Sequence, residues 1–260
     1  MSESATKSIA NRRIRVSSST EQAYSDAAQL ILDDANRAIA QRGKFTIALS
    51  GGSTPKRLFE LMASEAWKNK IPWNNIEFFW GDERYVPPTD ASSNYRMTRE
   101  AMLDKVPISG VNVHRVMTEK PDQEAAAEYE KTIRQIVPAG ANGVPEFDLI
   151  LLGLGTNGHM ASLFPHQPAL HEHRKLVVAE YIDEVKMTRV TMTLPLINSA
   201  KSVVFVTLGP DKASVLREVI VGPRDPERLP AQLIQPSPGQ LTWLIDAPAS
   251  AELPKEILNS

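Results

Sequence analysis

The chain has 260 residues, of which 42% are hydrophobic and 23% are charged, and these fractions exclude a disordered, collagen-like or coiled-coil protein. The 29 Lys and Arg residues nearly balance the 31 Asp and Glu residues, so no basic excess is available for nucleic acid or for an anionic membrane surface. With 0 Cys, the chain has no disulfide, no thiolate nucleophile and no cysteine-ligated metal.

The first 16 residues are polar and then basic, without the apolar core of a signal peptide. No apolar run approaches the roughly 20 residues that a membrane-spanning helix needs. We therefore expect a cytoplasmic protein without a membrane partner.

Short apolar runs alternate along the chain with segments of helical periodicity. Helices are predicted from a capping box at Ser18 and Glu21 to Gly43, and after Thr54 with Leu58, Leu61 and Met62 on one face. Further helices are predicted at residues 93–103, 122–136, 210–221 and 247–252. Strands are predicted at residues 13–16, 45–49, 76–80, 149–152, 176–181, 189–193, 203–207 and 241–245.

This alternation predicts an α/β fold with a mostly parallel sheet flanked by helices. No linker divides the chain, so we expect one domain over residues 13–260, preceded by a loose arm over residues 1–12. In such sheets, ligands bind beyond the carboxyl ends of the strands. The segments that follow the strands are therefore where chemistry is expected.

The first such segment is Ser50-Gly51-Gly52-Ser53-Thr54-Pro55. Glycines let the backbone approach an anion, and Thr54 followed by Pro55 is typical of a helix start. Free N–H groups at a helix start, beside hydroxyl groups, suit a phosphate. The alternative is a tight turn that binds nothing.

The second segment is Gly81-Asp82-Glu83-Arg84, directly after an apolar strand. The Arg84 guanidinium could hold a phosphate, and the Asp82 carboxylate could orient a substrate hydroxyl. The alternative is a solvated loop with an internal ion pair.

The third segment, residues 153–159, spells G-x-G-x-x-G followed by His159. A dinucleotide site would need a helix after the third glycine, but Pro165 and Pro168 interrupt that stretch, so we reject a nicotinamide or flavin cofactor. His159 is a candidate general base near neutral pH, with a structural loop histidine as the alternative. The nearby His166, His171 and His173 make a metal conceivable, but no ligand spacing supports one, so no metal is expected.

The fourth group consists of Arg189, at a predicted strand start, and Lys212, where a predicted strand passes into a helix. Each cation could reach an anion at the same edge of the sheet, and each could equally be a solvated surface charge.

Taken together, these segments resemble the 6-phosphogluconolactonase family. The resemblance extends from about residue 45 to residue 246 and rests on residues 48–55, 80–87 with Ser93-Asn94-Tyr95, 153–165, Arg189-x-Thr191 with Pro195-x-Ile197-Asn198, and Gly209-x-x-Lys212. It implies a modified Rossmann-like three-layer sandwich and hydrolysis of 6-phosphoglucono-δ-lactone in the pentose phosphate pathway, without a cofactor. It also implies that His159 activates water and that residues 50–54, Arg84, Arg189 and Lys212 surround the phosphate and the sugar hydroxyls. A monomer that binds a small sugar-phosphate lactone is expected.

One position departs from the family pattern, because Asn157 stands where the family usually has Asp. An amide can orient a group by hydrogen bonds, but it cannot carry charge. We therefore expect Asn157 to orient its neighbours and His159 to be a weaker base than usual.

Two other functions remain open on the sequence. Amino-sugar-phosphate isomerases share the fold, but they carry a Glu five residues after the histidine, where this chain has Phe164. A sugar-phosphate sensor without catalysis is the other alternative, and Asn157 keeps it open. Binding of 6-phosphogluconate without turnover of the lactone would distinguish the sensor.

Overall fold

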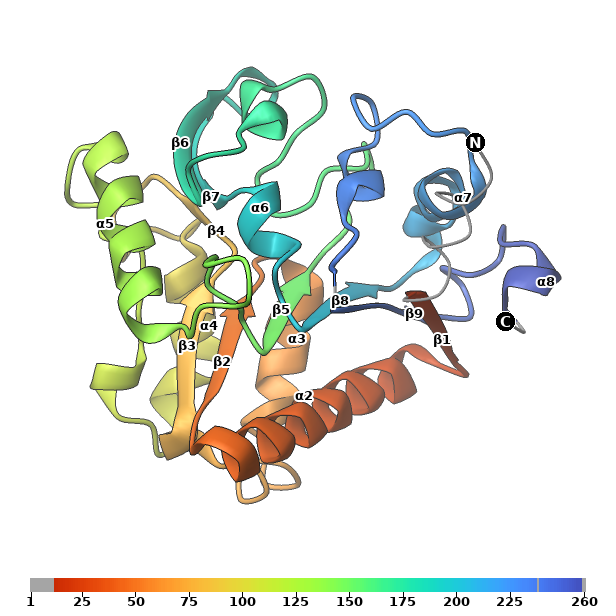
Figure 1. Ribbon diagram of the computed structural model, residues 1–260. Helices are drawn as coiled ribbons and strands as arrows, with labels where there is room; N and C mark the ends of the chain where they lie inside the picture. The colour runs from red at the N-terminus through yellow and green to blue at the C-terminus, as the bar shows by residue number, and fades with distance from the viewer. Residues whose placement is uncertain (1–11, 238, 259–260) are drawn as a thin grey trace.

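The computed structural model describes residues 12–237 and 239–258. Its centre is a six-stranded sheet in the order β1-β9-β8-β5-β2-β3, in which every neighbouring pair is parallel (Figure 1). The strands are β1 (Arg12–Ser17), β2 (Phe45–Leu49), β3 (Ile76–Trp80), β5 (Leu149–Leu152), β8 (Ser202–Thr207) and β9 (Gln240–Asp246). The predicted parallel sheet is confirmed.

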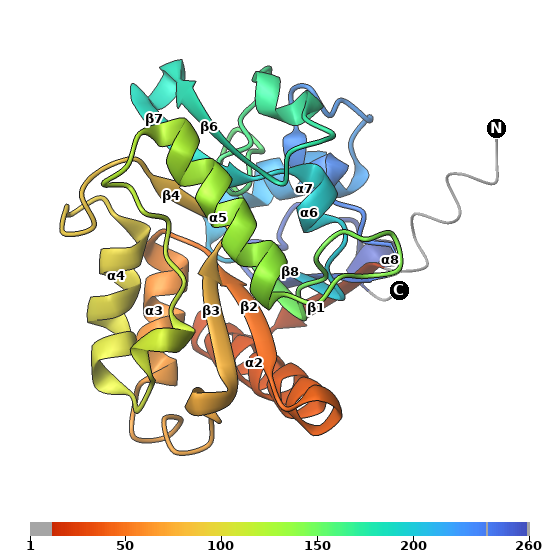
Figure 2. The same ribbon diagram turned by 60° about the vertical axis from the view of Figure 1, so that its left-hand side comes forward.

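Two hydrophobic clusters cover the two faces of this sheet, because successive side chains of a strand point to opposite faces. In β5, for example, Leu149 and Leu151 join one cluster, whereas Ile150 and Leu152 join the other. The first cluster holds residues of α2 (Thr20–Arg42), α3 (Ser53–Met62) and α4 (Asn94–Ala101). The second holds residues of α5 (Asp122–Ile136), α6 (Leu194–Ile197) and α7 (Ala213–Val221). The fold is thus the expected three-layer sandwich (Figure 2).

The observed helix ends agree with the predicted ones at some positions and differ at others. Helix α2 is capped by Ser19, whose hydroxyl accepts from the Gln22 N–H, and not by the predicted Ser18. It ends at Gly43 with a positive φ of 78°, as predicted. The predicted helix over residues 247–252 is wrong: these residues form turns, and the last helix is α8 (Lys255–Leu258), directly after Pro254.

A second, smaller sheet was not predicted. It is antiparallel, has the order β4-β7-β6 and consists of β4 (Asp82–Arg84), β6 (Val177–Ile182) and β7 (Met187–Met192). The three residues of β4 are all charged, so no local signal marks them as a strand; pairing with a strand about a hundred residues away makes them one. Since β4 follows β3 after one residue, the small sheet lies beyond the carboxyl ends of β2 and β3 (Figure 1).

Among the described residues, no helix is both long and apolar enough to cross a membrane. Of the arm expected over residues 1–12, residues 1–11 lie outside the described residues, and Arg12 already belongs to β1.

Candidate active site

The strands β8, β5, β2 and β3 are consecutive in the parallel sheet, so their carboxyl ends lie along one edge. The chain leaves these ends through residues 209–212, 153–159, 50–54 and 81–84, respectively. These are the segments singled out in the sequence. Arg189 reaches the same edge because β7 pairs with β4.

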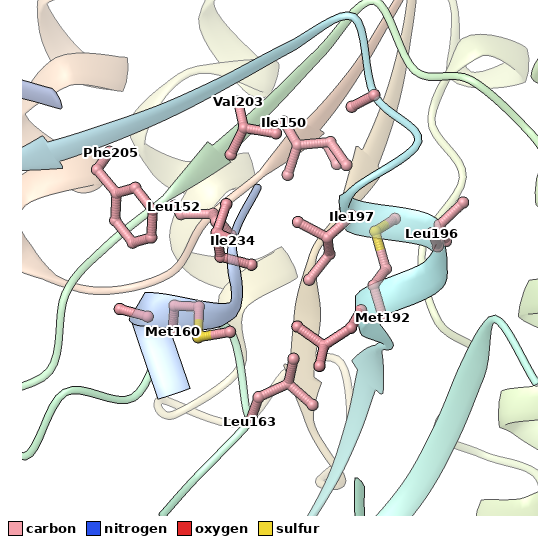
Figure 3. Packing of buried hydrophobic residues seen from close by; sticks show 14 of the residues in the cluster. Ile150, Leu152, Met160, Leu163, Met192, Leu196, Ile197, Val203, Phe205 and Ile234 are labelled. Carbon is pink, nitrogen blue, oxygen red and sulfur yellow. The ribbon is translucent and has the colours of Figure 1, made fainter. Parts of the chain in front are cut away.

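The loop that carries His159 is anchored in the core. Met160 and Leu163 are buried and belong to the same cluster as Leu152, the last residue of β5 (Figure 3). Gly155 is required, since a Cβ there would lie 2.1 Å from Nδ1 of His159. The backbone therefore wraps closely around the imidazole, and the apolar anchors hold the ring at the edge of the sheet.

The imidazole of His159 is held on two sides. Its Nδ1 lies 2.6 Å from Oδ1 of Asn157, and its ring stacks on Phe164 with a centroid distance of 4.1 Å and an interplanar angle of 10°. The amide nitrogen of Asn157 in turn donates to Glu184, at 2.9 Å and 3.1 Å from the two carboxylate oxygens. Within the described part of the chain, Nε2 of His159 has no hydrogen-bond partner.

Burial lowers the pKa of His159 from its ordinary 6.5 to about 4. The carboxylate of Asp82 acts in the opposite direction, and the positive charges of Arg189, Lys212 and Arg84 lower this pKa further. The imidazole is therefore neutral at physiological pH, which is the form in which it can accept a proton.

Asp82 is buried among polar groups that link three of the segments. Its Oδ2 accepts from the hydroxyl of Ser162 at 2.6 Å, and its backbone oxygen accepts from the Asn94 amide at 3.0 Å. A Cβ at Gly51 would lie 1.9 Å from Oδ1 of Asn94, so only glycine fits at that position. These contacts fix the Asp82 carboxylate next to the His159 loop.

Arg84 and Arg189 are direct cross-strand partners in β4 and β7, so their side chains lie on the same face of the small sheet. Arg189 is only 9% exposed, and burial together with the charge of Arg84 lowers its pKa. Nε of each guanidinium is buried without a hydrogen-bond partner among the described residues. Arg84 is half-buried and donates from Nη1 to the Ser92 backbone oxygen at 2.7 Å, whereas Arg189 is buried. Two neighbouring cations with donors left over form a site that favours an anion.

The Ser50–Thr54 segment differs in detail from the prediction. The N-cap of α3 is Gly52, with φ of 105°, and neither Thr54 nor any other side chain caps the helix. Ser53 and Thr54 are the first two helical residues, and Pro55 is the third. The first turn of α3 contains no acidic residue, so its N–H groups face the edge of the sheet without a carboxylate of their own.

Lys212 ends a short 3₁₀ helix, η6 (Pro210–Lys212), and caps α7. Its Nζ lies 3.3 Å from Oδ2 of Asp211, and its side chain is 23% exposed. Of the candidate cations it is the one with a carboxylate already beside it.

Sequence reasoning missed three residues of this site. Asn94 and Ser162 lie within segments that carry the family resemblance, so a signal was present. Glu184 has no such signal, because it is exposed and lies 27 residues beyond Asn157.

The conceivable metal site near the histidines finds no support in the part of the chain that the structure describes, where no group of three or more His, Asp or Glu side chains is placed to hold an ion. His166, His171 and His173 are exposed, and His171 pairs with Glu227 at 3.2 Å.

The chain was compared with known families and proteins. Residues 18–243 match the family described as glucosamine-6-phosphate isomerases/6-phosphogluconolactonase. A 6-phosphogluconolactonase of Synechocystis is 47% identical over 218 residues, which cover 84% of this chain and 88% of the relative.

Solved structures agree with the fold. The crystal structure of the devB protein superposes with a TM-score of 0.86 at 34% identity, covering 94% of this chain and 100% of the other. The 6-phosphogluconolactonase of Trypanosoma brucei superposes with a TM-score of 0.82 at 27% identity, covering 94% of this chain and 99% of the other.

Proposed function

Because the chain belongs to the family of glucosamine-6-phosphate isomerases and 6-phosphogluconolactonases, we propose that it hydrolyses 6-phosphoglucono-δ-lactone to 6-phosphogluconate, with His159 as the base. The observation that carries this proposal is a neutral imidazole, set among three cations, whose Nε2 has no hydrogen-bond partner among the described residues. A base of this kind suits water activation, and cations suit a substrate that carries a phosphate.

The phosphate binds to the paired guanidinium groups. Nε of Arg84 and of Arg189 is a buried donor without a partner in the described part of the chain, and the uncapped first turn of α3 adds N–H groups at the same edge. The hydroxyls of Ser50 and Ser53 and the carboxylate of Asp82 are then available to the sugar hydroxyls. Since the phosphate is remote from the ester, its binding energy serves to orient the lactone carbonyl.

The reaction needs one base and no covalent intermediate. Nε2 of His159 takes a proton from water as the water oxygen bonds to the lactone carbonyl carbon. The tetrahedral intermediate then collapses, the bond from this carbon to the ring oxygen breaks, and the ring oxygen takes the proton from Nε2. The product is the open-chain acid, and the imidazole returns to its neutral form.

Substrate binding should change the pKa of His159. The charges of Arg189, Lys212 and Arg84 contribute to the low pKa of His159 in the free protein. A bound phosphate dianion offsets these charges, which raises the pKa of His159. The imidazole is therefore a stronger base with substrate bound than without it.

The isomerase alternative is disfavoured by the surroundings of the imidazole. Phe164 stands where the isomerases have their Glu, and its ring lies flat on His159. No carboxylate can occupy that side of the imidazole.

All residues used here come from one chain, so the proposed site needs no partner subunit and is compatible with a monomer.

The test uses freshly generated lactone and follows the appearance of 6-phosphogluconate above spontaneous hydrolysis. His159→Ala should reduce kcat by about 10²- to 10⁴-fold while the affinity for 6-phosphogluconate survives. Binding without any acceleration by the unmodified protein would instead identify a sugar-phosphate sensor.

A further inference from the structure

The carboxylate of Glu184 and the backbone N–H of His159 together set the orientation of the Asn157 amide. The Asn157 nitrogen lies 2.9 Å and 3.1 Å from the two oxygens of that carboxylate. An ionised carboxylate only accepts hydrogen bonds, so the NH₂ group of the amide must face it. The amide oxygen then necessarily points the other way, toward His159.

The amide oxygen in turn decides the tautomer of the imidazole. Oδ1 of Asn157 lies 2.6 Å from Nδ1 of His159 and also accepts from the His159 backbone N–H at 3.2 Å. Because an amide oxygen cannot donate, the hydrogen must be on Nδ1 of the imidazole. The lone pair is left on Nε2, the nitrogen without a hydrogen-bond partner in the part of the chain that the structure describes.

We propose that Glu184 is a positioning residue of the active site, which acts through Asn157 to hold His159 in the tautomer that accepts a proton at Nε2. This inference rests on the proposed function. The three side chains form a relay in which the carboxylate is one step removed from the imidazole. Glu184 thereby places a negative charge beside the neutral amide of Asn157.

The place of Glu184 in the fold supports this role. It lies in the 3₁₀ turn η5 (Asp183–Val185), which joins β6 to β7. The same β7 strand carries Arg189, so one hairpin holds a proposed phosphate ligand and the start of the relay. The neighbouring Asp183 makes no contact with Asn157 and instead pairs with Lys186 at 3.2 Å, which makes it a matched control.

A purely structural latch between the hairpin and the His159 loop would show the same hydrogen bonds. The two roles separate kinetically, because a positioning residue affects kcat, whereas a latch affects stability or KM. They also separate when Asn157 is changed. In an Asn157→Asp protein the introduced carboxylate accepts from Nδ1 directly and has no N–H for Glu184, so the relay is bypassed.

The experiment compares lactone hydrolysis by four proteins: the unmodified chain, Glu184→Ala, Glu184→Gln and Asp183→Asn. Glu184→Ala should lower kcat about tenfold with KM nearly unchanged, in line with other groups that orient a reactive histidine from its far side. Glu184→Gln keeps an oxygen that accepts from Asn157, so its loss should be smaller. Asp183→Asn should behave like the unmodified chain.

The decisive comparison repeats Glu184→Ala in the Asn157→Asp background. In that background Glu184→Ala should leave kcat unchanged or raise it, because the substitution removes the repulsion between two neighbouring carboxylates. An equal loss in both backgrounds, or no loss in the unmodified background, would overturn the proposal.

A second readout does not depend on turnover. In protein labelled with ¹⁵N histidine, the ring nitrogens of His159 should report hydrogen on Nδ1, and Glu184→Ala should give a mixture of tautomers. An unchanged tautomer in Glu184→Ala overturns the positioning role. If the unmodified chain does not accelerate lactone hydrolysis, the proposed function fails, and the tautomer experiment still decides the role of Glu184.

Discussion

The parallel sheet carries a charged cluster at each end, and the two clusters are built differently. At the amino ends, a groove of about 230 Å³ is lined by charged side chains, among them Asp148, Arg42 and Lys201. Asp148 is buried and pairs with Arg42, with Lys201 at 3.0 Å and with the Thr46 N–H at 3.0 Å. At the carboxyl ends, Arg84 and Arg189 lie side by side with buried donors that have no partner among the described residues.

This difference separates a structural cluster from the proposed binding site. At the amino ends, Asp148 pairs with both neighbouring cations and accepts the Thr46 N–H, and Glu146 lies 3.6 Å from Lys201 as a second carboxylate. Two cations thus face two carboxylates, and this cluster stabilises the fold. The guanidinium groups of the half-buried Arg84 and the buried Arg189 are held near each other, an arrangement that costs folding free energy until an anion arrives. Four changes test the distinction, taken from the largest expected effect to the smallest.

Asp148→Ala should destabilise the protein without affecting the reaction. The change leaves Arg42 and Lys201 without their shared partner and the buried Thr46 N–H without an acceptor. We expect a loss of about 3 kcal/mol, at the low end for a broken buried pair because both cations are partly exposed and can turn to water. Urea unfolding measures the loss, and a large change in KM for the lactone would contradict the assignment.

The low pKa of His159 should make the folded protein less stable in acid. The pKa of His159 is about 4 in the folded protein and about 6.5 when the chain is unfolded. Between these values the unfolded state binds the proton and the folded state does not, so stability falls as the pH falls from 6.5 toward 4. Between pH 7 and pH 4.5 we expect this group to remove about 2 to 3 kcal/mol.

The control for this titration is His159→Gln, which has no titrating group at that position. The free energy of unfolding of the unmodified protein should decrease more than that of the variant over the same pH interval. Equal decreases in the two proteins would show that the His159 imidazole titrates normally and is not desolvated by its loop.

In contrast to Asp148→Ala, Arg189→Met should weaken substrate binding and leave stability intact. It removes the buried member of two neighbouring cations, so stability should be unchanged or slightly higher. KM for the lactone should rise about 10- to 100-fold, because a hydrogen bond to a charged group contributes about 1.5 to 3 kcal/mol. A melting temperature that falls while KM stays constant would place Arg189 with the structural charges.

How much of this could be read from the sequence depends on how local each feature is. Strand β5 and helix α5 lie at their predicted bounds, since four consecutive apolar residues and a clear helical period are local signals. Strand β4 could not be found, because three charged residues become a strand only by pairing with β7. The failed helix over residues 247–252 includes Pro248, which disfavours helical geometry in the residue before it.

Within the site, too, local features could be predicted from the sequence, whereas features that depend on long-range strand pairing could not. The positions of His159, Asp82 and Lys212 follow from strands that end at one edge, so the sequence could place them. The paired guanidinium groups and the contact of Glu184 with Asn157 depend on the small sheet. The sequence pattern predicts the parallel sheet but not the small antiparallel sheet. It therefore locates only those site residues that follow the parallel strands.

Among the described residues, the charge of Lys212 is partly paired, unlike that of Arg189 and less completely than the charges around Asp148. Its removal should have the smallest effect on KM for the lactone. Its Nζ already lies 3.3 Å from Asp211, and part of the side chain is in water, so much of its charge is screened. Lys212→Ala should raise KM for the lactone only about threefold to fivefold, roughly 1 kcal/mol, with kcat little changed. Asp211→Asn is the matched control: it frees Lys212 from its carboxylate and should lower KM slightly. If Lys212→Ala left KM unchanged and Asp211→Asn had no effect either, Lys212 would belong with the structural charges, and the phosphate would be held by the paired arginines and the start of α3 alone.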